Sequence, residues 1–259
     1  SVHVPDYDTP MQKVTAVATN NAQASLSEAT RSYEDLAAEN EQLKQQVNEL
    51  NQQLVEFYQY KQENAQLKNY LGLKENNPDY QFVSASVINR DPNNLYYTFT
   101  LDQGSNAGVK VNDPVITDQG VVGWVSQVSA MYCEVTTILS PDTNISATDK
   151  VNRESGTISS NAQLSDQGLI KLGLLEAGTT VQEGDIIVTS GIGGKFPKDL
   201  LIGKAVEVKP EENDVSLYAT VEPFVDIKTV RDVIIITSFN GQGEVADNTD
   251  TNNASSNGG

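Results

Sequence analysis

The sequence predicts a mainly β protein that carries one long N-terminal coiled-coil α-helix. Residues 26–76 contain no proline, contain a single glycine at Gly72, and are rich in Glu, Gln, Leu, Lys and Asn. After Pro78 the chain changes to short apolar runs separated by Gly, Asn, Asp and Pro. The first pattern favours an uninterrupted helix, and the second favours antiparallel strands joined by turns.

A heptad repeat within residues 26–76 predicts a coiled coil. Apolar residues recur every seven positions at two sites of the repeat, a and d, over its central part. A helix of about 50 residues spans roughly 75 Å, so a narrow apolar stripe along it needs a second helix to cover it. The dimer interface predicted from this stripe consists of Tyr33, Leu36, Asn40, Leu43, Val47, Leu50, Leu54 and Phe57.

Polar residues in the stripe indicate how the helices pair. Asn40 occupies an a position, where an asparagine hydrogen-bonds its counterpart and favours a parallel two-stranded coil. Lys61, Asn64 and Lys68 interrupt the stripe further on, so we expect paired helices to loosen there. The alternatives are a helix that packs on its own domain and an Asn40 that marks a polar break near a fraying end.

The region after Pro78 is predicted to form two small β-barrels. Short strands with turns such as Asp118-Gln119-Gly120 between them are typical of sandwiches and barrels. No helical pattern intervenes to make the crossovers of a parallel sheet. The predicted strands are 82–89, 95–101, 115–117, 121–128, 135–139, 156–159, 169–172, 185–189, 202–208, 217–222 and 232–237.

These patterns divide the chain into five segments. Residues 1–25 are expected to be a linker or lead-in, and residues 26–76 the coiled-coil helix. The first barrel is expected at 78–150 and the second at 151–239, with a C-terminal strand that is free to return to the first barrel. Residues 240–259 lack large apolar residues and are predicted to be a disordered acidic tail.

Composition excludes several classes of protein. Asp and Glu outnumber Lys and Arg by 35 to 17, and a net charge of -18 excludes a protein that binds nucleic acid by neutralising phosphates. One cysteine, Cys133, and one histidine, His3, exclude an intrachain disulfide and a zinc site built from Cys and His. There is no apolar run long enough to span a membrane, and the chain begins at Ser1 without a signal segment, so we expect a processed or truncated product.

Catalytic and cofactor motifs are absent, so the predicted catalytic, cofactor-binding and metal sites are none. Ser190 lacks the glycine two residues earlier that a nucleophile elbow requires, and no histidine is available to the β region. The run 191–195 differs from a phosphate-binding loop at Thr189 and Phe196. Trp124 and Cys133 are predicted to pack in barrel cores, and the carboxylates to lie mainly on solvated surfaces.

Three segments in order resemble one family. These are residues 101–109 (LDQGSNAGV), 118–125 (DQGVVGWV) and 184–197 (GDIIVTSGIGGKFP), behind a coiled coil that ends in Leu71-Gly72-Leu73. With the closing strand that ends in Val233-Ile234-Ile235, they resemble the rod-shape-determining protein MreC family over about residues 30–238. The stretch 189–197 is the most specific part of the resemblance.

The resemblance implies a non-catalytic scaffold of the bacterial cell-elongation machinery. It implies two small six-stranded barrels, held in pairs by the coiled coil, that organise peptidoglycan synthesis and cell shape. Members of the family work with MreD and class B penicillin-binding transpeptidases. They are anchored in the cell membrane by one N-terminal helix, which this chain lacks, so we expect it to be the extracytoplasmic portion, on a Gram-positive exterior or in a periplasm.

A glycine-rich loop is the first candidate for a partner-facing or barrel-to-barrel surface. It consists of Gly191, Gly193, Gly194, Phe196 and Pro197, and the alternative is an internally packed turn. Two other functions stay open from the residues alone. One is a secreted protease or hydrolase that depends on Ser190, and the other is a carbohydrate-binding surface protein that depends on Trp124.

Overall fold

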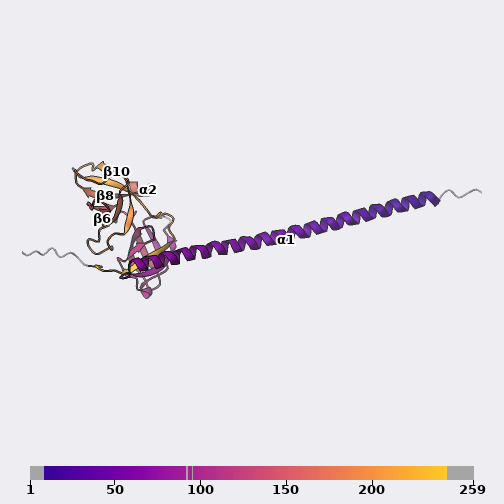
Figure 1. Ribbon diagram of the computed structural model, residues 1–259, viewed down its shortest axis with the longest axis horizontal. Coiled ribbons are helices and arrows are strands. Elements are labelled where there is room, and N and C mark those ends of the chain that lie inside the picture. Colours follow the sequence, from indigo (N-terminus) through magenta and orange to yellow (C-terminus); the bar gives the residue numbers. More distant parts are fainter. Residues whose placement is uncertain (1–8, 92, 95, 244–259) are drawn as a thin grey trace, which may run out of the picture. The chain divides into compact units, whose positions relative to one another are not determined.

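The structure, a computed structural model, describes residues 9–91, 93–94 and 96–243. It contains one long helix, α1 (Thr9–Asn76), followed by twelve strands in two closed antiparallel barrels (Figure 1). The predicted fold class, a long N-terminal helix before two six-stranded barrels, is therefore confirmed. The chain divides between Gln66 and Leu67 into two units, and each is described by itself.

Helix α1 begins much earlier than the sequence predicts. Residues 1–25 were expected to be a linker, but the helix starts at Thr9. Of that expected linker, residues 1–8 lie outside the described part of the chain. Pro10 falls in the first turn, where a missing N–H costs no hydrogen bond. The following Ala, Gln, Thr and Asn residues have no apolar period, but a long helix extends through such residues because adding one to it is far easier than nucleating one.

The first barrel consists of β1 (Gln81–Arg90), β2 (Thr98–Leu101), β3 (Pro114–Ile116), β4 (Val121–Val128), β5 (Cys133–Thr137) and β12 (Asp232–Ser238). Its strands close in the order β1-β12-β3-β4-β5-β2. The C-terminal strand β12 lies between β1 and β3, so the first barrel is completed by the end of the chain. A short 3₁₀ turn, η1 (Ser105–Ala107), follows β2.

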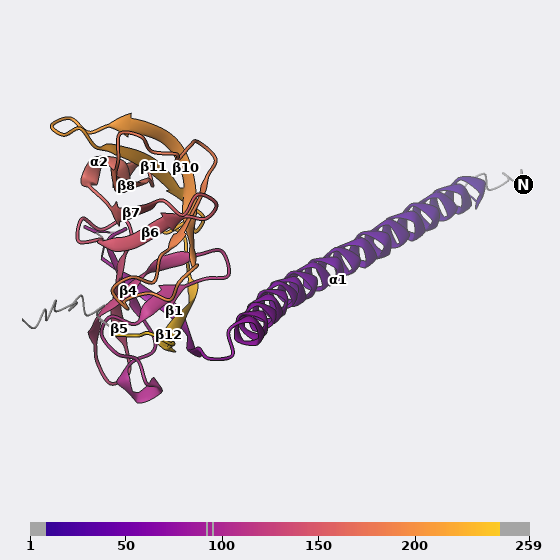
Figure 2. The ribbon, with the colours of Figure 1, turned by 60° about the vertical axis from the view of Figure 1, so that its left-hand side comes forward.

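The second barrel consists of β6 (Ile145–Asp149), β7 (Ser155–Ser159), β8 (Ile170–Leu175), β9 (Ile186–Thr189), β10 (Leu201–Pro210) and β11 (Leu217–Pro223). Its strands close in the order β10-β11-β8-β7-β6-β9, and Figure 2 shows the short helix α2 (Ala162–Asp166) beside them.

The expected boundary between the barrels at residue 150 is wrong, because β6 belongs to the second barrel. This strand was not predicted. Its sequence, Ile-Ser-Ala-Thr-Asp, has small side chains and no large apolar residue after Ile145, yet Ile145, Ala147 and Thr148 are buried. Pairing with β7 and β9 buries it without the bulky β-branched pattern that marks the other strands.

A row of aromatic rings joins the end of α1 to the first barrel. Tyr70 meets Phe82 at 6.0 Å between ring centroids, Phe82 meets Tyr80 at 5.8 Å, and Tyr80 meets Phe239 at 6.3 Å, all edge to face. Leu73 packs against the same core. The last turns of the helix are thus part of the unit that contains the barrels.

The segment after β12 folds back instead of starting a tail at residue 240. The Gln242 side-chain amide donates to the Asp113 carboxylate at 3.1 Å, and the Gly243 N–H donates to the Gly194 carbonyl oxygen at 3.0 Å. Residues 240–243 are thereby held against both barrels. The remainder of the predicted acidic tail, residues 244–259, lies outside the described residues.

Candidate functional site

The predicted dimer interface lies on an uncovered face of α1. The seven large apolar members of the stripe are between 49% exposed (Leu54) and 78% exposed (Tyr33), and Asn40 is exposed as well. Exposed apolar residues scattered singly are ordinary, but a continuous stripe of this length costs solvation energy unless it is covered. The stripe is therefore a long apolar surface that no other described residue covers.

The apolar surface of α1 widens at one end of the stripe. Val55, Tyr58 and Tyr60 are all more than half exposed and flank the a and d residues Leu54 and Phe57. The Phe57 and Tyr58 rings meet edge to face at 5.9 Å between centroids. Val55, Tyr58 and Tyr60 thus add exposed apolar surface beside the stripe. They lie outside the a and d positions, where a two-stranded coiled coil would cover them only in part.

The glycine-rich loop is packed and not offered whole to a partner. Gly194, Phe196 and Pro197 are buried, which argues against the predicted partner-facing surface at these residues. The Thr189 hydroxyl donates to the Pro197 carbonyl oxygen at 2.5 Å, tying the loop to β9. Together with the bond from Gly243 to Gly194, this holds the loop between β9 and the segment after β12, and its role as a partner-facing or barrel-to-barrel surface stays a prediction.

Backbone conformation explains the glycines of this loop. Gly191, Gly193 and Gly194 have φ values of 77°, 86° and 64°, in the left-handed region that other residues rarely adopt. A Cβ atom on Gly191 would also come within 3.0 Å of the Lys198 Cβ. The chain can reverse here and lay Phe196 against the first barrel only because these positions lack side chains.

The chemistry of the described residues gives no support to an active site. The Ser190 hydroxyl accepts from the Ile192 N–H at 3.2 Å within its own turn, and no histidine or acid orients it. Cys133 is fully buried, and burial, with smaller effects from Asp113 and Asp102, raises the pKa of its thiol to about 11. Among the described residues no cluster of His, Cys, Asp and Glu could hold a metal ion.

A cavity of about 270 Å³, the inter-barrel cavity, lies where the glycine-rich loop meets the first barrel. Its apolar walls are Trp124 of β4, Ile145 of β6 and Phe196 of the loop. Four exposed polar side chains surround them, namely those of Asn112, Asp142, Asn144 and Lys195. Residues of both barrels and of the connection between them therefore build one site.

Trp124 was predicted to pack inside a barrel, but it is half-buried and lines the inter-barrel cavity. It lies on the same side of β4 as Ser126, whereas Gly123 and Val125 alternate with them and are buried. The polar Ser126 two residues along the strand is the signal that could have placed Trp124 on the outer face. Nothing in the sequence could have brought Asn144 and Lys195 to it.

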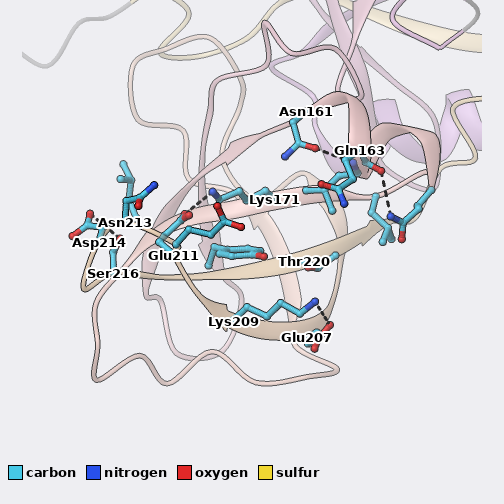
Figure 3. A pocket seen from close by; sticks show the side chains of 16 residues that line it. Asn161, Gln163, Lys171, Glu207, Lys209, Glu211, Asn213, Asp214, Ser216 and Thr220 are labelled. Carbon is cyan, nitrogen blue, oxygen red and sulfur yellow. Dashed lines mark hydrogen bonds and ion pairs between the residues drawn. The ribbon is translucent and has the colours of Figure 1, made fainter.

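A larger groove of about 670 Å³ lies on the second barrel, between α2 and the hairpin of β10 and β11 (Figure 3). Its cations are already paired. Lys171 Nζ lies 2.5 Å from Glu211 Oε1 and 4.6 Å from the centroid of the Tyr218 ring, and Lys209 Nζ lies 3.1 Å from Glu207 Oε2. Both lysines at the centre of this groove are therefore already engaged by glutamates.

Comparisons with known proteins identify the family. The model of the family described as rod shape-determining protein MreC, barrel core, matches residues 87–237. The chain belongs to the MreC family. The match runs from β1 to β12 and so takes in both barrels, which confirms the resemblance found in the sequence.

Individual MreC proteins resemble the chain over most of its length. The cell shape-determining protein MreC of Listeria monocytogenes is 32% identical over 212 residues, which are 82% of this chain and 72% of the relative. That of Escherichia coli is 28% identical over 211 residues, 82% of this chain and 56% of the relative. A solved structure of MreC from Listeria monocytogenes is 30% identical with a TM-score of 0.59, over 81% of this chain and 100% of the other.

Membership of the MreC family decides the class of function. MreC proteins determine cell shape and are not enzymes, so the prediction that the chain is not an enzyme is confirmed on this ground. Among the described residues, no helix is long and apolar enough to cross a membrane.

Proposed function

We propose that this MreC-family chain is a non-catalytic scaffold that dimerises through α1 and presents its barrels to membrane-bound wall-synthesis proteins. The partners in this proposal are a class B penicillin-binding transpeptidase, MreD and other elongation proteins. We place the barrels on the outer side of the cell membrane, held by a single-pass N-terminal anchor. The observation that carries the proposal is the continuous uncovered apolar stripe from Tyr33 to Phe57.

Charge placement supports parallel, in-register pairing. Counting from Leu36 at d, Glu39 occupies a g position and Lys44 the e position of the next heptad. In a parallel dimer these are the positions that meet across the seam, so each Glu39 would face the Lys44 of the second chain. Asn40, between them in the seam, favours the same arrangement. In an antiparallel pair, g positions face g positions. Each Glu39 would then no longer face a Lys44 of the second chain.

Pairing explains how a protein without chemistry acts on enzymes. Two chains zipped along α1 bring two copies of each barrel surface close together, which raises the effective concentration of the second copy once the first is bound. A surface that binds one conformation of a transpeptidase better than another also shifts the population toward it. The scaffold thus changes where an enzyme is and which state it adopts.

The molar mass in solution tests the pairing. We expect the full chain to elute with light scattering at twice its mass of 28.1 kDa, because the stripe is buried only in a dimer. The double variant Leu43→Lys/Leu50→Lys places charge in the seam and should be a monomer. The matched control Gln45→Lys/Gln52→Lys adds the same charge on the opposite face and should remain dimeric. A monomeric wild type, or a dimeric seam variant, would refute the proposal.

A binding experiment tests the link to wall synthesis. The extracytoplasmic domain of a class B transpeptidase from the same bacterium is immobilised, and wild type and the seam variant are passed over it. Bivalent attachment should make wild type dissociate at least about 100-fold more slowly. Equal dissociation rates would separate partner binding from pairing, and an absence of binding in both would remove the transpeptidase from the proposal.

A further inference from the structure

The inter-barrel cavity has the composition of a small-ligand site. Trp124, Ile145 and Phe196 give it apolar walls, and Asn112, Asp142, Asn144 and Lys195 stand around them. Ligand sites commonly combine apolar and aromatic walls with a few polar groups that fix orientation. We propose that this cavity binds one ring of a neutral sugar.

The polar side chains of the cavity are available to a ligand. The side chains of Asn112, Asp142, Asn144 and Lys195 make no hydrogen bond or ion pair within the described residues. Together they offer two amides, which donate and accept hydrogen bonds, one carboxylate, which accepts, and one ammonium group, which donates. This differs from the groove on the second barrel, where Lys171 and Lys209 are already paired with glutamates.

The wall and the rim together favour a sugar over a purely apolar ligand. A pyranose ring has an apolar face of C–H groups that packs on an aromatic ring, and Trp124 offers such a ring half-buried at the wall. Its hydroxyl groups point outward around the ring, and exposed polar side chains next to the apolar walls are suited to bind such groups. An apolar side chain would fill the walls but leave these four polar groups unused.

Size and charge narrow the ligand further. A volume of about 270 Å³ is below the roughly 300–1,000 Å³ of sites for drug-sized ligands, so the cavity takes one ring and not several. Asp142 and Lys195 carry opposite charges, and the chain as a whole carries -18, which disfavours an anionic ligand. A single ring of a neutral sugar meets both conditions.

The single tryptophan makes the test direct. Trp124 is the one tryptophan of the chain, so fluorescence excited selectively at tryptophan, and not at the ten tyrosines, reports on this cavity. The full chain is titrated with tri-N-acetylchitotriose. We expect a saturable change in emission with a Kd on the order of 1 mM, as befits a single ring with few contacts.

Two variants locate the binding. Asn144→Ala removes an exposed rim amide and should weaken binding roughly 3- to 10-fold. Asn213→Ala removes an amide from the groove of Figure 3 and should leave the titration unchanged. Trp124→Ala, followed by titration calorimetry, should abolish binding, with its thermal unfolding measured alongside to verify the fold.

Three outcomes would overturn the proposal. One is no saturable change at ten times the expected Kd, and another is equal affinity of wild type and Asn144→Ala. The third is a saturable response to N-acetyl-leucinamide but not to the sugar, which would make the cavity an anchor site for a peptide side chain. None of these depends on whether α1 dimerises, so the scaffold proposal is tested separately.

Discussion

The Tyr70 ring of α1 packs edge to face on the Phe82 ring of β1, with 6.0 Å between centroids and 67° between planes. Nearby, the Asn69 amide donates to the Asp118 carboxylate at 3.0 Å. The end of the helix is thereby part of the first barrel's own packing. Any force or constraint that acts on the last turns of α1 therefore reaches β1 without a flexible joint between Leu73 and the core.

Removing this ring should destabilise the barrel as well as the helix end. We expect Tyr70→Ala to lower the free energy of unfolding by about 1–3 kcal/mol, because it deletes an aromatic pair and its buried area. Urea unfolding followed by Trp124 fluorescence measures the barrel directly. Glu75→Ala, at an exposed position of the same helix end, is the control and should change stability by less than about 0.5 kcal/mol. A Tyr70→Ala curve that superposes on wild type would contradict the coupling.

A pair of carboxylates makes the second barrel sensitive to pH. Asp149 Oδ2 is buried without a hydrogen-bond partner, and Asp185 lies beside it. Desolvation, followed by the hydrogen bond that only a protonated Asp185 can donate to Asp149, raises the pKa of Asp185 above its usual value of 3.8. The folded state therefore binds this proton more tightly than the unfolded state. This proton stabilises the folded state fully below the pKa that Asp185 has in the unfolded chain. The stabilisation is lost as the pH rises through the raised pKa of Asp185 in the folded state.

Asp185→Asn should remove that dependence. An amide supplies a permanent N–H to the unpaired Asp149 oxygen, so we expect a variant that is more stable than wild type at neutral pH by about 1 kcal/mol. Its advantage should shrink as the pH falls toward 4. Thermal unfolding between pH 4 and pH 7 measures both effects, with Glu183→Gln in the same turn as the control. A loss of stability at neutral pH would show that the amide at position 185 does not donate to Asp149.

Close packing between strands fixes certain glycines. A Cβ atom on Gly123 of β4 would lie 2.0 Å from the Thr136 carbonyl oxygen of β5, a distance that no rotamer change relieves. Gly123→Ala should therefore cost at least about 1–3 kcal/mol. Gly173 of β8 is also buried in a strand, but its Cβ would meet no atom closer than 3.5 Å. Gly173→Ala should be tolerated, and equal losses in urea unfolding would show that backbone flexibility, not contact, limits both sites.

Most of the strands that the sequence predicted carry several large apolar residues. β4 (Val121–Val128) was predicted to its ends, because four valines and Trp124 stand between clear turn residues. β6 was missed because Ser146, Ala147 and Thr148 carry no hydrophobic pattern, and it is strand pairing on both sides that buries them. Because β6 was missed, the boundary between the barrels was predicted at residue 150 and not before Ile145. A strand with its own apolar sequence pattern can be predicted locally. A strand without one, such as β6, is defined by the strands that pair with it.

A candidate site could be predicted from the sequence where all of its residues lie on one helix or strand. The stripe on α1 follows from heptad spacing alone, since residues seven apart share a helix face. The inter-barrel cavity needs Asn112, Trp124, Asn144 and Lys195 at one place, and these come from two barrels and their connection. The burial of Phe196 depends on the same packing. Such long-range arrangements leave no spacing signal in the sequence.

The orientation of the proposed dimer can be decided by single cysteines placed at two d positions. Leu50 occupies a d position, where the two copies of a parallel in-register coil approach each other across the seam. We expect Leu50→Cys to form a covalent dimer under mild oxidation, seen as a band of doubled mass on a non-reducing gel. The native Cys133 does not interfere, because its fully buried thiol has a pKa of about 11 and is almost entirely protonated at neutral pH.

Gln52→Cys places the same thiol on the opposite face of α1 and is the matched control. It should stay monomeric on the gel while still sedimenting as a dimer, because the seam is unchanged. An antiparallel pair brings residue 50 opposite itself only if the helices happen to cross there, so Leu36→Cys provides a second point two heptads away. Crosslinking at both 36 and 50 is possible only in the parallel register that also joins Glu39 to Lys44, and crosslinking at just one of them would exclude it.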